Sequence, residues 1–385
     1  MTDPLLELTE EQRAIVGTAR AFADERLRPF AAAWDEAAHF EASLVPALGA
    51  LGFLGMLLPP EHDGLGLDTR SYLLALEEIA VADASTAVLM SVHNSLPTQM
   101  LLRFGTAAQQ ARFLAPMARG ELLGAFALSE PEAGSDAAAL RCQARRDGDD
   151  WILDGAKSWV TSGSHAGVIL AMARTDTAEA RHGAKGISAF IITPDLPGFS
   201  VSKKEDKLGL RASPTVQLVF DGMRVPGDRL LGAEGQGFTY AMQSLEHGRL
   251  GIAAQAIGIA RAAFEAAAAY VQERKQFGQA IGGFQAVQFK LADMATRITA
   301  ARALVHAAAA AKDRGVAVGA QASMAKLFAS ETAMWVTTQA VQLFGGYGYV
   351  KEYPVERYFR DAKVTEIYEG TSEIQRIVIG RSVTS

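Results

Sequence analysis

A single glutamate near the carboxyl end of the sequence could act as a proton acceptor. Glu369 lies in the segment "IYEGTSEIQR" (residues 367–376), between an aromatic residue and a glycine and just before Thr371 and Ser372. A carboxylate in this setting can cap a helix, stay solvated on the surface, or take a proton. Only the third role requires a dry pocket that raises the proton affinity of the carboxylate toward neutral pH. The segment alone favours a capping or solvated carboxylate, so the role of Glu369 depends on its surroundings.

Four other segments contain residues that could bind a ligand. They are "FALSEPEAGSD" (126–136), "KSWVTSG" (157–163), "ERKQFG" (273–278) and "QLFGGYGY" (342–349). On a regular strand Trp159 and Thr161 would point to the same face, and the N–H groups of a glycine turn could meet a phosphate or a carbonyl. Each segment also has a purely structural interpretation, namely strand packing, a helix-terminal charge pattern or a helix C-cap. Taken alone, none of them establishes a site.

Composition and motifs exclude several classes of function. The sequence has no GxGxxG after a predicted strand and no GxxxxGK[ST], so neither a Rossmann nor a P-loop nucleotide site is indicated. Its single cysteine, Cys142, and seven scattered histidines offer no metal-ligand spacing, and we expect no metal. The net charge of −6, with no sustained basic run, gives no reason to expect nucleic-acid binding.

The hydropathy pattern predicts a protein without a membrane span. No stretch reaches the roughly 18 uncharged apolar residues that a span requires. The first residues, "MTDPLLELTEEQ", lack the order of a signal peptide and the basic character of a transit peptide. We therefore expect a cytoplasmic location.

The predicted elements that must position these segments follow the order α, β, α. Residues 1–120 have helical periodicity, with a capping box at Thr9 and Gln12 and one apolar face at Tyr72, Leu76 and Ile79. Residues 121–230 contain short β-prone runs with two Asp-Gly turns, as in a compact β domain. Residues 231–385 predict long helices near 236–273, 284–312 and 318–344 and a shorter one from about 372, which suggests a four-helix bundle. The fold class is therefore an α+β multidomain protein.

In this order and spacing, the five segments together resemble the acyl-CoA dehydrogenase family. The likeness extends over essentially the whole chain, and its most specific part is "TEIYEGTSEIQR". The segments "MSVHNSL", "KLGLRASPT", "GRLGIAAQAIGIA" and "QFKLADMA" are similar to the short-chain and short-branched-chain members. The resemblance implies an N-terminal helical domain, a middle β-barrel domain and a C-terminal four-helix bundle, with FAD bound between the barrel and the bundle.

The resemblance also implies which residues contact the flavin. In the β domain these are Phe126, Leu128, Ser129, Gly134, Ser135, Trp159, Val160 and Thr161, with Trp159 packing on the flavin and Thr161 donating its hydroxyl toward N5. In the helical bundle Arg274, Phe277, Gln285, Gln342, Leu343, Phe344, Gly345 and Gly346 match positions that bind the FAD of a neighbouring subunit. Thr371, Ser372 and Glu373 match residues near the phosphates and the adenosine part. A homo-oligomer, commonly a tetramer, is implied.

By the same resemblance Glu369 is the catalytic base, which removes the α-proton of an acyl-CoA while flavin N5 accepts the β-hydride. Substrate contacts fall on Ser135, Glu246, Arg249, Tyr368 and Gly370, although Arg249 could equally form a structural salt bridge. Relatives that carry the glutamate on another helix place it where this chain has Gly248. One departure is Glu132, which stands where the family often has glycine.

The expected reaction is FAD-dependent formation of a trans-2-enoyl-CoA from a short or short-branched acyl-CoA, with electrons passed to an electron-transfer flavoprotein. An acyl-CoA oxidase, whose reduced flavin reacts with oxygen, is the close alternative. A flavin- or CoA-binding scaffold without turnover is the alternative from another class, and the presence of Glu369 argues against it.

Overall fold

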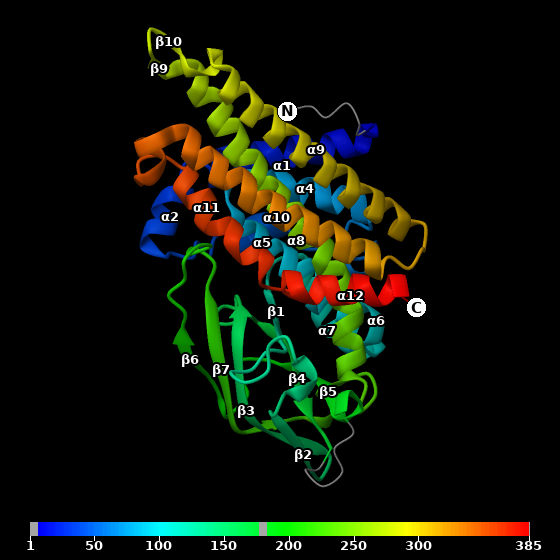
Figure 1. Cartoon of the computed structure of the whole chain (residues 1–385). Helices are drawn as coiled ribbons and strands as arrows, with labels where there is room; N and C mark the ends of the chain where they lie inside the picture. Colours follow the sequence, from blue (N-terminus) through cyan, green and yellow to red (C-terminus); the bar gives the residue numbers. More distant parts are fainter. Residues whose placement is uncertain (1–6, 177–182, 385) are drawn as a thin grey trace.

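The chain folds into two helical parts with a β-sheet between them in the sequence (Figure 1). The computed structural model describes residues 7–176 and 183–384. The predicted order α, β, α is confirmed. The predicted domain limit at 120 falls between the last N-terminal helix and the first strand, whereas a limit at 230 would divide strand β8 (Leu230–Leu231).

The N-terminal part consists of short helices, several of which begin at a side-chain cap. Thr9 and Gln12 form the predicted capping box at the start of α1 (Glu10–Phe22), and Asp68 caps α4 (Thr69–Ala82) by accepting a hydrogen bond from the Ser71 N–H. The other helices are α2 (Ala31–Ala37), α3 (Leu44–Ala50), α5 (Ala84–Ser95), α6 (Pro97–Phe104) and α7 (Ala107–Ala118).

Helix α4 differs from its prediction. The sequence favoured one buried face, but nearly every residue of α4 is buried. The helix packs against α1, α5, α8 and α9, so it has no solvent face. Burial of this kind depends on neighbours distant in sequence, which the local pattern does not contain.

The middle part is one eight-stranded sheet in the order β6-β7-β3-β2-β4-β5-β8, with β1 paired to β4 in parallel. Its strands are β1 (Gly124–Ala127), β2 (Gln143–Asp147), β3 (Asp150–Thr161), β4 (Val168–Arg174), β5 (Ile187–Ile192), β6 (Phe199–Lys204), β7 (Thr215–Val225) and β8.

Only one of the two predicted Asp-Gly turns forms a turn. Gly148, with φ +66°, links β2 to β3, as predicted. Gly155 instead lies inside β3, next to a register shift between Leu153 and Gly155. A β-carbon on Gly155 would stand 2.8 Å from Cα of Cys142, so this glycine permits close strand approach at a bulge.

The C-terminal part contains α8 (Gly237–Glu273), α9 (Gln285–Asp313), α10 (Gly319–Phe344), α11 (Val355–Lys363) and α12 (Ser372–Thr384). The three long helices and the last one are confirmed, while α11 was not predicted. Within the described residues, α8 alone is long and apolar enough to cross a membrane, but 72% of its most apolar window is buried inside the protein, as in a core helix.

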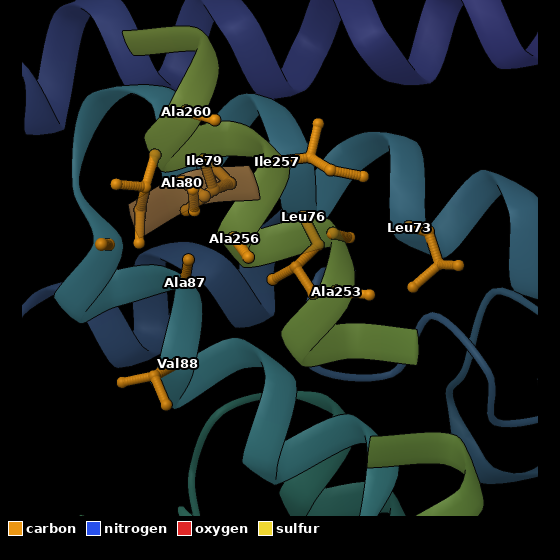
Figure 2. Close-up of a cluster of buried hydrophobic side chains, with 14 of the residues drawn as sticks. Leu73, Leu76, Ile79, Ala80, Ala87, Val88, Ala253, Ala256, Ile257 and Ala260 are labelled. Atoms are coloured by element: carbon orange, nitrogen blue, oxygen red, sulfur yellow. The ribbon is translucent and has the colours of Figure 1, made fainter. Parts of the chain in front are cut away.

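The N-terminal and C-terminal helices share one hydrophobic core. Figure 2 shows Leu76 and Ile79 of α4 beside Ala253, Ala256 and Ile257 of α8. The two helices approach closely at Gly258, where a β-carbon would lie 2.4 Å from Cβ of Ala80. Packing against α4 and α5 therefore fixes the face of α8 that carries the site described next.

Candidate active site

Glu369 lies in the tight loop between the 3₁₀ turn Val364–Glu366 and α12. Its φ of +52° is unusual for a residue with a side chain, and Gly370 follows with φ +94°. Nε2 of Gln375 donates to the carbonyl oxygens of Glu369 (3.2 Å) and Gly370 (2.9 Å), and Nζ of Lys326 donates to the Gly370 carbonyl at 2.9 Å. These bonds hold the loop in a conformation that costs about 1–3 kcal/mol on its own.

The surroundings of Glu369 decide between the three roles that the sequence left open. The hydroxyl of Thr371, not Glu369, accepts from the backbone N–H of Ile374 in the first turn of α12, at 3.4 Å. Both carboxylate oxygens of Glu369 are buried and have no hydrogen-bond partner among the described residues. Glu369 is therefore neither a helix cap nor a solvated carboxylate.

Burial raises the pKa of the Glu369 carboxyl to about 7, although the positive charges of Lys326 and Arg249 act in the opposite direction. An unpartnered carboxylate with that proton affinity can accept a proton near neutral pH. The local environment thus has the property that a general base requires.

Gly248 of α8 makes room for this carboxylate. A β-carbon on Gly248 would lie 1.9 Å from Oε2 of Glu369, which is far inside van der Waals contact. The carboxylate therefore rests directly on the backbone of α8. Any side chain at position 248 would compete with Glu369 for the same space.

The same face of α8 continues to Gly251 and Gln255, one and two turns beyond Gly248. A β-carbon on Gly251 would stand 2.4 Å from the Ser91 hydroxyl and 3.2 Å from the Tyr72 hydroxyl. Both hydroxyls are buried, and Ser91 lies close enough to Tyr72 to act on its phenol. This face of α8 is therefore lined by small residues and by two buried hydroxyls.

Gln255 lies at the far end of that face of α8. Its Nε2 donates to the carbonyl oxygen of Ala84 at 2.8 Å, and its Oε1 accepts a hydrogen bond from the Tyr368 hydroxyl. The side chain is fully buried. The Tyr368 hydroxyl thus connects the loop that carries Glu369 to α8.

Arg249 follows Gly248 on α8 and lies close enough to Glu369 for its positive charge to act on that carboxylate. Its Nη1 donates to the Ser323 hydroxyl at 3.2 Å, while its buried Nε has no partner. Within the described residues it forms no ion pair, so the alternative of a structural salt bridge is not supported. Glu246 lies near the start of α10, 3.1 Å from the position of a β-carbon on Gly319.

The predicted flavin contacts of the β domain gather where β1 ends and β3 ends. The Ser129 carbonyl accepts from the Ser158 N–H at 2.9 Å, and the buried Lys157 Nζ bonds the Leu128 carbonyl (3.2 Å) and Glu130 (2.7 Å). These bonds fix the segment after β1 against β3. Of the other predicted contacts, Phe126 lies in β1, Val160 and Thr161 lie in β3, and Gly134 and Ser135 follow in the loop.

Trp159 departs from the regular strand that the sequence suggested. Its φ is +61°, and the pairing of β3 with β7 shifts register between Lys157 and Val160. This bulge interrupts the regular strand on which the period-two argument rests, so the shared face of Trp159 and Thr161 stays a prediction. The indole is 62% exposed, which leaves a flat aromatic surface for a planar ligand.

The predicted contacts of the helical bundle form a separate site. Arg274, Gln342, Leu343, Phe344, Gly345 and Gly346 line one cavity of about 880 Å³. Gly345, with φ +61°, ends α10 there, and the Arg274 guanidinium lies 5.3 Å from the centre of the Tyr347 ring. Neither Glu369 nor Trp159 lines this cavity.

The segment "ERKQFG" proves to be a hairpin and not only a helix end. Helix α8 stops at Glu273, and β9 (Lys275–Gln276) pairs with β10 (Gln279–Ala280) at one end of the bundle (Figure 1). Phe277 and Gly278 both have positive φ, as in a two-residue hairpin turn, and Phe277 is 93% exposed. Gln285, the first residue of α9, is exposed as well.

The remaining predicted residues lie at the start of α12. Ser372 is buried with an unpartnered hydroxyl, and Glu373 is exposed in the first turn. Glu132 pairs with Arg141, and both side chains are exposed. Residues that the sequence did not single out as site residues are Lys326, Gln255, Tyr72 and Ser91. Lys326 had one visible signal, a charge within the apolar segment "MAKLFA".

The arrangement fits FAD in two respects. Trp159, near the end of β3, is exposed, and Ser162, three residues later in the sequence, is buried with an unpartnered hydroxyl. A glycine turn and Arg274 border a cavity of about 880 Å³. The first suits a planar ring system, and the second suits the phosphates and adenine of a dinucleotide.

Comparison with known proteins gives the family. Residues 9–121, 125–223 and 235–384 match the N-terminal, middle and C-terminal domains of the acyl-CoA dehydrogenases. The chain is 49% identical over 374 residues to the mitochondrial short-chain specific acyl-CoA dehydrogenase of Bos taurus, covering 97% of this chain and 90% of that protein. It is 46% identical to the short-chain specific enzyme of Clostridium acetobutylicum, covering 98% of each.

Solved structures agree. The butyryl-CoA dehydrogenase of Megasphaera elsdenii superposes with a TM-score of 0.96 at 43% identity, covering 99% of this chain and 100% of that one. A glutaryl-CoA dehydrogenase of Mycobacterium smegmatis in complex with FADH2 gives 0.93 at 35% identity, covering 98% and 95%. The chain therefore belongs to the acyl-CoA dehydrogenase family and is an FAD-dependent acyl-CoA dehydrogenase.

Proposed function

We propose that this enzyme dehydrogenates a short acyl-CoA to its trans-2-enoyl-CoA, with Glu369 as the base that removes the α-proton. The observation that carries the proposal is the Glu369 carboxylate, which is buried and unpartnered, with its pKa raised by burial to about 7. Proton removal next to a thioester builds negative charge on the carbonyl oxygen. The proposed donor from this chain is the backbone N–H of Glu369, held by the bonded loop at Gly370.

Bound FAD supplies the acceptor for the β-hydride. The residues proposed to hold it are those of the segment after β1, Trp159 and Thr161 of β3, and the start of α12. Arg249 and Glu246 of α8 are proposed to border the CoA, and Tyr368 is proposed to form one wall of the pocket for the acyl group. The unpaired Nε of Arg249 supports a ligand role for that side chain.

We infer the length of the acyl group from the face of α8 beyond Glu369. From Gly248 the face passes Gly251 and ends at Gln255, about 10 Å along the helix axis. Gln255 cannot swing aside without breaking its bonds to Ala84 and Tyr368. We infer a preference for butyryl- to hexanoyl-like or short branched acyl groups, as the names of the short-chain and butyryl-CoA relatives also suggest.

Each methylene contributes only about 0.8 kcal/mol, so the preference is best measured over a series. The purified holoenzyme is titrated anaerobically with acyl-CoAs of increasing length and with branched ones, and flavin bleaching is followed in the visible spectrum. Short acyl-CoAs should bleach the flavin with the highest kcat/KM. A maximum at twelve carbons or longer would contradict the inferred pocket length.

We infer that the electron acceptor is an electron-transfer flavoprotein. A chain 47% identical to this one, with a TM-score of 0.96, comes from a structure described as an electron transferring flavoprotein of Acidaminococcus fermentans. The oxidase alternative remains chemically close, since a prolyl acyl-carrier-protein oxidase has the same fold at 32% identity and a TM-score of 0.94. Peroxide release in air, compared with reduction of an added electron-transfer flavoprotein, separates the two.

We further propose that FAD is shared between subunits of a homo-oligomer, commonly a tetramer in this family, in the cytoplasm. The support is the separation of the two predicted sets of flavin contacts, with the Arg274 cavity apart from Glu369 and Trp159. Replacing Arg274 by alanine should lower both flavin content and oligomer size in one gel-filtration peak. A monomer with full flavin content would contradict a shared site.

A further inference from the structure

A buried lysine lies behind the catalytic loop. Lys326 of α10 has no solvent-exposed surface, and its Nζ donates to the Gly370 carbonyl at 2.9 Å. Within the described residues no carboxylate forms an ion pair with it. The other fully buried lysine, Lys157, in contrast has Glu130 at 2.7 Å.

An ammonium group without a paired carboxylate is costly to bury, even after its surroundings relax. A methionine or leucine would fill the same space on α10 without that cost. The charge of Lys326 therefore needs another explanation than packing. The hydrogen bond to Gly370 accounts for one of its three protons.

The nearest explanation is the charge of Glu369. Burial lowers the pKa of Lys326 to about 8, and the leading opposing influence is the negative charge of Glu369. Conversely, the positive charge of Lys326 is the leading influence that opposes the burial-driven rise in the pKa of Glu369. The two groups thus stabilise each other's charged forms inside the same pocket.

We propose that Lys326 is a positioning residue that fixes the Glu369–Gly370 peptide and keeps the Glu369 carboxylate anionic, ready to accept the α-proton. This inference rests on the proposed role of Glu369. Its chemical consequence is simple: a neutral residue at position 326 leaves a buried carboxyl that stays protonated to higher pH and cannot act as a base there.

Other charged groups face the same pocket. Arg249 on α8 also favours the anion, and Glu246 lies near Arg249. Glu366 and Glu373, at the two ends of the loop, act to raise the pKa of Lys326. Burial and, to a smaller extent, the negative charge of Glu369 raise the pKa of the Tyr72 and Tyr368 phenols. Lys326 differs from Arg249 because it also bonds the backbone of the catalytic loop.

The test separates the charge of Lys326 from its hydrogen bond. Lys326→Gln keeps a donor for the Gly370 carbonyl but removes the charge, Lys326→Met removes both, and Lys326→Arg keeps the charge. Ser330→Ala, one turn further along α10, is the matched control because its hydroxyl bonds only the Leu327 carbonyl. Each holoenzyme is mixed with butyryl-CoA without oxygen, and the rate of flavin bleaching is followed against pH.

The Gln and Met variants should move the pH midpoint of the bleaching rate upward by about one unit or more, while the Arg and Ser330→Ala variants keep it. Infrared difference spectra of the carboxyl band, with Glu369→Gln as the blank, report the same titration without turnover. If Lys326→Met fails to fold, Lys326→Gln alone still tests whether the charge of Lys326 sets the pH midpoint.

An unchanged midpoint in Lys326→Gln, by rate and by infrared, would overturn the inference even if the rate fell. A failure of the role proposed for Lys326 can be distinguished from a failure of the role proposed for Glu369. Retained bleaching in Glu369→Gln would refute the base itself, whereas an inactive Glu369→Gln with an unshifted Lys326→Gln refutes only the role of Lys326.

Discussion

Replacing Gly248 by alanine should displace the Glu369 carboxylate, the proposed base, without unfolding the protein. The new methyl group would lie 1.9 Å from Oε2 of Glu369. Ordinary contact begins near 3.4 Å, so the carboxylate must retreat by about 1.5 Å. It can do so because it is the end of a flexible side chain, and alanine itself favours the helix over glycine by about 1 kcal/mol.

A shift of this size should reduce activity strongly. Misplacing a reacting group by about 1 Å can cost 10²-fold in rate, so we expect the rate of flavin bleaching to fall by at least about 10²-fold. That loss corresponds to roughly 2.7 kcal/mol of activation free energy. FAD content and the affinity for butyryl-CoA, measured on the same sample, should stay within a few-fold of wild type.

The matched control is Gly17→Ala in α1, a helical glycine whose added methyl meets nothing within 4 Å. It should keep wild-type activity. Wild-type bleaching by Gly248→Ala, with the protein folded and flavin bound, would refute the claim that the Glu369 carboxylate works from the surface of α8.

Three further predictions concern the same pocket. Glu369→Gln should raise the free energy of unfolding by up to about 3 kcal/mol above pH 7 and by little near pH 4.5. The buried carboxyl keeps its proton to about pH 7 whereas the unfolded chain loses it near 4.5, so the stability of the wild type falls across that window. Denaturant titrations of the two proteins that show no such pH-dependent difference would contradict this prediction. Moving the base, by Glu369→Gly together with Gly248→Glu, should restore part of the bleaching rate lost in Glu369→Gly, since the space at position 248 is then free; no recovery in a folded, flavin-bound double variant would count against this geometry. Gln255→Ala should shift the kcat/KM maximum toward longer acyl-CoAs, and an unchanged chain-length profile would show that Gln255 does not end the pocket.

The sequence predicted the elements whose signals are local. The long helices carry their period over many residues, and the capping box at Thr9 and Gln12 and the turn at Gly148 depend on neighbouring residues only. The Asp-Gly pair at Gly155 has the same local signal but lies inside β3, where it makes a close contact with Cys142, the residue just before β2. Local patterns cannot separate these two glycines.

The site was predicted through the resemblance, and the structure adds what a motif does not contain. The positive φ of Trp159 and Glu369 is held by neighbouring backbone pairing and by Gln375, so residue type alone gives no sign of it. Lys326 is 43 residues before Glu369 in the chain and meets its loop only through folding. Long-range contacts of this kind were beyond the sequence pattern.

The central claim, that Glu369 is the base, is tested most directly by the anaerobic reaction of the Glu369→Gln holoenzyme with butyryl-CoA. Glutamine keeps the size of the side chain but has no basicity, so bleaching should slow by at least about 10²-fold while FAD content and butyryl-CoA binding persist. Near-normal bleaching by this variant, with Glu246 intact, would show that another group removes the α-proton.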